Sequence, residues 1–219
     1  MRLYQMADGG VLVSAREYDI AASTAIREGQ VVKLSDGLVV AAAAGETGAI
    51  LGVAAESHSG QADALDPRAD GKRIMVVDAP GAIFQCAAPK LTAASGTATT
   101  IVAPEGSLAA FTSGDLKGGY VKLIEKAEGS ANADAVGQVR RIESYANGTL
   151  TVESGGAAAA GDVYAIFPPV GFAKGNLSAD GTALVLSATA NLPVKVVGHD
   201  RDLVRLNIKA RKLLLAEIE

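Results

Sequence analysis

Two short turn signals constrain the fold of this chain more than any other feature. Asp36-Gly37 separates the apolar runs 31–34 and 38–40, and Asn147-Gly148 separates 137–142 from 149–152. Asp, Asn and Gly tolerate the positive φ angles of a tight hairpin turn. With the Pro80-Gly81 turn, these signals predict an all-β fold of antiparallel hairpins, forming one or two small barrel or sandwich modules with little helix.

The length of 219 residues suits one large all-β domain or two smaller ones. We predict an N-terminal arm at residues 1–10, a first β domain at 11–105 and a second at 106–219. The arm has too little apolar content to bury itself, so we expect it to lie along a neighbouring subunit or another partner. Residues 91–100 are small and polar, which fits either a linker or a Thr-rich edge strand.

The two halves repeat one series of motifs. Gly29-Gln30-Val31, the Asp36-Gly37 turn and an Ala run at 41–44 are matched in order by 137–139, Asn147-Gly148 and 157–160. We hypothesise two related β modules, in which 29–50 and 137–166 superpose strand for strand. The alternative is that hairpins in an Ala- and Gly-rich chain converge through composition alone.

Charge and composition bear on the class of partner. A formal net charge of −4 argues against binding to nucleic acid, which usually requires a basic surface. No run approaches the about 18 apolar residues of a membrane span, and the N-terminal sequence lacks the apolar core of a signal peptide. Aromatic residues make up only 4% of the chain. A core poor in aromatics buries less apolar area per residue, so we expect the protein to gain stability by assembly.

No residue pattern predicts catalysis, a cofactor or a metal ion. His58 and His199 lack a second ligand at zinc spacing, and Gly71-Lys72 lacks the first glycine and the Ser or Thr of a phosphate-binding loop. Three acidic residues in the 57–72 loop match no calcium-binding loop: Asp63, Asp66 and Asp70. We therefore expect a protein that is not an enzyme.

The C-terminal region contains an alternating segment at 203–212. Val204, Leu206 and Ile208 alternate with polar residues, and this period of two predicts an amphipathic strand. The polar face is basic, and it is either an ordinary solvated face or a docking surface for an acidic partner. The candidate partner contacts are three residues of this segment and two of the arm: Arg205, Lys209, Arg211, Arg2 and Tyr4.

A family resemblance lies in residues 18–88. The series Ser23-Thr24-Ala25-Ile26, 29–34, Asp36-Gly37, Gly45-Glu46-Thr47 and 50–56, followed by strands around Pro80-Gly81, resembles the capsid decoration (cement) proteins of tailed bacteriophages.

The resemblance implies a structural virion protein, made in the host cytoplasm, that sits on the capsid surface and holds neighbouring capsomers together. It further implies a homotrimer and the major capsid protein as partner, and the charge and hydropathy given above add the expectation of neither membrane nor nucleic-acid binding. The alternative function is a β-barrel binding module for carbohydrate or another surface ligand. Such a module would require aromatic stacking platforms, and the Tyr and Phe residues of this chain are scattered.

Overall fold

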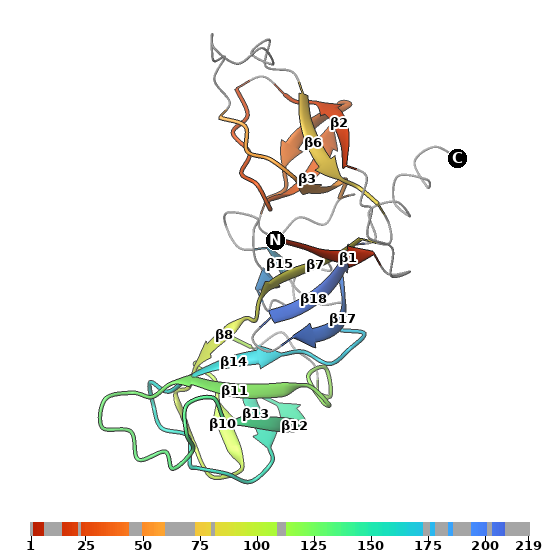
Figure 1. The fold of residues 1–219 in the computed structure, drawn as a ribbon. Coiled ribbons are helices and arrows are strands. Elements are labelled where there is room, and N and C mark those ends of the chain that lie inside the picture. Colours follow the sequence, from red (N-terminus) through yellow and green to blue (C-terminus); the bar gives the residue numbers. More distant parts are fainter. Residues whose placement is uncertain are drawn as a thin grey trace.

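The fold is all-β, as the turn signals predict. The structure, a computed structural model, describes residues 2–6, 15–21, 23–43, 50–59, 73–79, 82–108, 113–172, 176–177, 184–185, 194–200 and 203–208. Within these ranges the regular elements are strands, without a helix, and every pairing between strands is antiparallel. The strands form sandwich-like open sheets rather than closed barrels (Figure 1).

A five-stranded sheet contains most of the segment that resembles decoration proteins. Its strands are β2 (Ala15–Asp19), β3 (Val31–Ser35), β4 (Leu38–Ala41), β5 (Gly52–Ala54) and β6 (Arg73–Val77), in the order β2-β6-β5-β3-β4. The predicted hairpin joins β3 to β4, and its turn residues Asp36 and Gly37 have φ angles of 51° and 79°. These angles are those of a primed turn, whose twist matches that of the strands. Ile20, after β2, forms an isolated bridge with Val39 on β4.

A seven-stranded sheet forms the opposite end of the molecule (Figure 1). Its strands are β8 (Lys90–Thr92), β9 (Ser95–Gly96), β10 (Thr100–Val102), β11 (Tyr120–Glu125), β12 (Val139–Ala146), β13 (Thr149–Val152) and β14 (Val163–Phe167), in the order β8-β14-β11-β12-β13-β10-β9. The first part of β12 pairs with β11 and the remainder with β13. Because β12 changes partner at an irregular register, the sheet bends into two facing layers.

Residues 90–102 were predicted to belong to the first domain (11–105), but they pair with strands of the predicted second domain (106–219). Its strands β8, β9 and β10 lie in one sheet with β11 to β14. Of the two alternatives for 91–100, the structure confirms the edge strand, since β8 and β9 occupy the two ends of the sheet order.

A four-stranded sheet lies between these two sheets (Figure 1). It consists of β1 (Arg2–Met6), β7 (Ala82–Ala87), β18 (Leu203–Ile208) and β17 (Val194–Asp200), in that order, and β15 (Asn176–Leu177) pairs separately with β16 (Leu184–Val185). Residues 2–6 belong to the segment expected to lie along a neighbour. In this structure they pair instead with β7 of their own chain, whose edge N–H and C=O groups they satisfy.

The largest hydrophobic core is continuous through all three sheets. It includes Val53 and Val77 of the five-stranded sheet, Phe84 and Val196 of the four-stranded sheet, and Ile166 of the seven-stranded sheet. These side chains are at most 7% exposed, so apolar contacts connect the sheets.

The two predicted modules share a hairpin but differ in chain order. Each hairpin has a third strand beside it, in an equivalent position. Gly29 N–H donates to Ala54 O at 2.8 Å in the first module, and Gly137 N–H donates to Leu123 O at 2.7 Å in the second. In the five-stranded sheet the third strand is β5, which follows the hairpin in the chain. In the seven-stranded sheet it is β11, which precedes the hairpin in the chain. The predicted strand-for-strand superposition therefore fails beyond the hairpin.

Candidate functional site

The candidate contacts of the arm and of the basic strand fall in the four-stranded sheet. Arg2 and Tyr4 lie on β1 and Arg205 lies on β18. Tyr4 sits where the register of β1 shifts. Lys209 and Arg211 lie outside the described residues.

The backbone brings two of these candidates into one row. Arg2 of β1 and Arg205 of β18 are both paired with Gln85 of β7, one from each side. Two strand spacings separate their backbones, which is about 10 Å. The sequence placed these residues in two unrelated segments, and it contained no signal that β7 would join them.

Where the structure describes them, the residues considered for catalysis or metal binding are not gathered into a site. His58 lies in an isolated bridge with Ile26, and its Nδ1 is 3.3 Å from Thr24 O. Across the part of the chain that the structure describes, no three His, Cys, Asp or Glu side chains come together as metal ligands. The same residues include no helix that could cross a membrane. Asp63, Asp66, Asp70 and Lys72 lie outside the described ranges.

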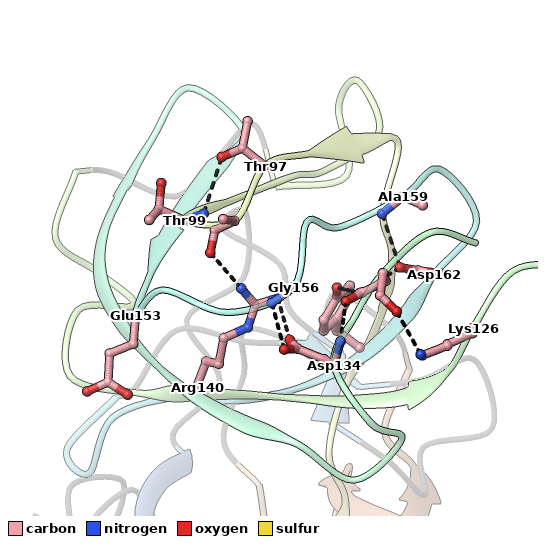
Figure 2. A network of polar contacts seen from close by, with 12 residues as sticks. Thr97, Thr99, Lys126, Asp134, Arg140, Glu153, Gly156, Ala159 and Asp162 are labelled. Atoms are coloured by element: carbon pink, nitrogen blue, oxygen red, sulfur yellow. Dashed lines mark hydrogen bonds and ion pairs between the residues drawn. The ribbon is translucent and has the colours of Figure 1, made fainter.

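A buried polar network lies at one end of the seven-stranded sheet (Figure 2). Its centre is Arg140 on β12, which is only 3% exposed. The Arg140 Nη2 atom lies 3.1 Å from Asp134 Oδ2, and Nη1 donates a hydrogen bond to Ala98 O at 3.0 Å. Asp134 Oδ1 in turn accepts the Gly156 N–H at 2.6 Å. The ion pair thus joins three loops: the one before β12, the one between β9 and β10, and the one after β13.

Asp162 anchors the other half of this network. Its carboxylate is fully buried and accepts the backbone N–H groups of Ala127 and Ala159, each at 3.0 Å. Asn132 Nδ2 donates to Asp162 Oδ2 at 2.8 Å and to the Tyr164 hydroxyl at 2.9 Å. Burial by itself would raise the pKa of Asp162, but these hydrogen bonds outweigh it and hold the pKa below its usual value.

Glycine makes the close approach of these loops possible. A Cβ atom at Gly156 would lie 2.2 Å from Asn132 Oδ1 and 2.5 Å from the backbone N of Asp134. A Cβ at Gly155 would lie 2.9 Å from Arg140 Cδ. The network is therefore a rigid clamp whose charged groups are engaged by protein atoms. Such an arrangement orders loops and the strand β12.

A second polar cluster lies on the five-stranded sheet. The Tyr18 hydroxyl donates to Asp78 Oδ2 at 2.5 Å, and Arg16 Nη1 lies 3.6 Å from the same oxygen. Burial first, and the neighbouring Asp78 carboxylate second, raise the pKa of Tyr18 to about 12. The cluster ties β2 to the residue that follows β6.

The outer surface of β11 and β12 combines exposed apolar and cationic residues. We call the residues Tyr120, Lys122, Val139 and Arg141 the β11–β12 face. Tyr120 is paired with Arg141, and Lys122 with Val139. Tyr120 is 40% exposed and Val139 is 49% exposed, and Val136, in the turn before β12, is 59% exposed. Their neighbours Val121, Leu123, Arg140 and Ile142 face inward and are buried.

Sequence reasoning missed both the network and this face. The run Val139-Arg140-Arg141-Ile142 carried a usable signal, because alternation from the buried Ile142 places Arg140 inside and Val139 outside. A buried arginine requires an acidic partner, and Asp134 lies nearby in the sequence.

Comparison of this chain with models of protein families, with curated proteins and with solved structures finds no match.

Proposed function

We propose that this protein decorates the outside of a tailed-phage capsid and stabilises the contacts between capsomers. The observation that carries the proposal is the residue pattern of 18–88 that resembles decoration proteins. The central turn of that pattern, Asp36-Gly37, forms the β3–β4 hairpin of the five-stranded sheet. The proposal includes a non-enzymatic homotrimer located in the virion, made in the host cytoplasm and bound to the major capsid protein.

The proposed mechanism is thermodynamic linkage. A protein that binds the assembled shell, but not free capsid subunits, lowers the free energy of the assembled state. A trimer can bind through several contacts at once, so that contacts that are weak singly act together through a high effective concentration.

The proposed contacts include Arg2, Tyr4, Arg205, Lys209 and Arg211. Arg2 and Arg205 support this role because they occupy one row of the four-stranded sheet. An exposed ion pair contributes only about 0–1 kcal/mol, so we expect a single substitution to have a small effect. Replacing both Arg2 and Arg205 by Ala should weaken binding more than replacing either one.

The test uses capsid heads assembled from the major capsid protein that the same genome encodes. Heads incubated with the purified protein should bind it, sediment with it and withstand a higher temperature than bare heads. Equal heat resistance of decorated and bare heads, together with no binding, would contradict the proposal. A glycan array provides the comparison with the alternative: specific sugar binding in the absence of head binding would favour a carbohydrate-binding module.

A further inference from the structure

The β11–β12 face is more apolar than the rest of the outward-facing side of β12. Along the second half of β12 the outward positions are polar, with Glu143 and Ser144 exposed, and Thr149 and Thr151 follow on β13. Along the first half the exposed residues are Val139, paired with Lys122, and Arg141, paired with Tyr120. The described residues include five exposed large hydrophobic side chains, and three of them lie on or beside this face: Tyr120, Val136 and Val139. The apolar exposure is therefore concentrated rather than scattered.

The face is held rigid from beneath by the buried polar network. Arg140 lies between Val139 and Arg141 in the chain, and its guanidinium is fixed by Asp134 and by Ala98 O. Two backbone hydrogen bonds fix the start of β12 to β11. Leu123 N–H donates to Gln138 O at 3.0 Å, and Gly137 N–H donates to Leu123 O at 2.7 Å. A surface that is ordered before binding loses less conformational entropy when a partner covers it.

The charges on the face indicate the chemistry of the partner. Each large apolar side chain, Tyr120 and Val139, is paired across the ladder with a cation, Arg141 and Lys122 respectively. Acidic residues border this four-residue patch: the exposed Glu143 lies two residues after Arg141 on β12, and Glu153 Oε2 accepts the backbone N–H of Arg141 at 3.2 Å. The four residues of the face themselves include two cations and no acidic residue, whereas the whole chain carries a net charge of −4. A complementary surface has an apolar centre with acidic groups beside it.

We infer that the β11–β12 face is a docking surface for an acidic, apolar-centred patch on the capsid shell. This inference rests on the proposed function and names the contact that the seven-stranded sheet makes. A protein that holds two capsomers together requires two separate contact surfaces. The row of Arg2 and Arg205 lies in the four-stranded sheet, and the β11–β12 face lies in a different sheet.

The test measures binding of variants to the same assembled heads by co-sedimentation. Val139→Glu and Arg141→Glu place negative charge in the centre of the face, and each should weaken binding at least about tenfold. Leu38→Glu is the matched control, because Leu38 is also an exposed apolar residue, at 38%, but lies on the five-stranded sheet. Val136→Glu, in the adjoining turn, replaces Val139→Glu if the latter loses its native circular dichroism spectrum.

The outcomes separate the inference from the function on which it rests. Loss of binding by the Val139 and Arg141 variants, with Leu38→Glu binding like the wild type, supports the inference. If both face variants bind heads as tightly as the wild type does, the inference is overturned and the proposed function still stands. Equal losses in the face variants and in Leu38→Glu also overturn it, because the effect then follows from added charge at any site. Failure of the wild-type protein to bind heads overturns the proposed function, and the inference with it.

Discussion

Removal of the Arg140 guanidinium should destabilise the protein strongly. In Arg140→Met the Asp134 carboxylate, which is 10% exposed, keeps the Gly156 N–H but loses its cation, and Ala98 O loses its donor. Breaking a buried ion pair by removing one partner costs about 3–5 kcal/mol, since a charge is left without compensation. That amount is a large part of the about 5–15 kcal/mol by which a typical domain is stable.

A second substitution isolates the cause of that loss. Replacing Asp134 by Asn in the Arg140→Met background removes the buried charge but keeps an oxygen that can accept the Gly156 N–H. The double variant should therefore be at least about 1 kcal/mol more stable than Arg140→Met alone. The neighbouring Arg141→Met is the control and should change the free energy of unfolding by no more than about 0.5 kcal/mol, because Arg141 is exposed.

The assay is urea denaturation monitored by circular dichroism and by tyrosine fluorescence. The chain has no tryptophan, and Tyr145 and Tyr164 are buried in the seven-stranded sheet, where they report on this part of the fold. The free energy of unfolding is extrapolated linearly to zero denaturant. A cost below about 1 kcal/mol for Arg140→Met, or a double variant no more stable than the single one, would refute the reasoning.

Three further predictions concern the clamp and the second polar cluster. Gly156→Ala should lower the free energy of unfolding by about 1–3 kcal/mol in urea, because its Cβ would lie 2.2 Å from Asn132 Oδ1; an unchanged midpoint would contradict this. The pKa of Asp162 is lowered in the folded state, so its stabilising contribution should be present near neutral pH and disappear as pH falls through that lowered pKa. Urea midpoints from pH 7 to pH 3 should therefore fall less in Asp162→Asn than in the wild type. Folding raises the pKa of Tyr18 to about 12, so the stabilisation from its bond to Asp78 should be lost as pH rises from 10 toward 12. Burial also raises the pKa of Tyr164, so alkaline titration of absorbance should show one late-titrating tyrosine fewer in Tyr18→Phe than in the wild type.

The sequence was sufficient for the local pairing of strands. Asp36-Gly37 and Asn147-Gly148 form the two predicted primed turns, since their residues adopt positive φ angles with little strain. Alternation likewise predicted the strand at 203–208. These are short-range properties, because the turn and the side-chain period are determined by neighbours in the chain.

Long-range pairing could not be predicted in the same way. Residues 2–6 have their partner near residue 84, and residues 203–207 have theirs on the same strand. An edge strand carries little information about which edge it will join, because the backbone groups that pair are the same in every residue. The sequence likewise did not predict that β5 follows its hairpin whereas β11 precedes its hairpin. The duplication hypothesis missed this difference in chain order.

The buried network was hidden for a different reason. Residues 125–134 are polar and suggest an ordinary solvated connection, yet Asn132 is only 3% exposed. Its burial depends on Gly156, Asp162 and Tyr164, which are at least 24 positions further along the chain. Polar residues predict exposure only when no distant group satisfies their hydrogen bonds.

The place of β7 in the chain has a consequence for biosynthesis. β7 lies in the sheet between β1, which the ribosome makes before β7, and β18, which it makes more than 100 residues after β7. All strands of the seven-stranded sheet are made in the interval, and their pairing with one another is complete without β17 or β18. On a translating ribosome the strands of that sheet can therefore pair while one edge of β7 still lacks its neighbour. The nascent chain carries an open strand edge during that time, which makes the stage before β18 emerges the one most exposed to misassociation.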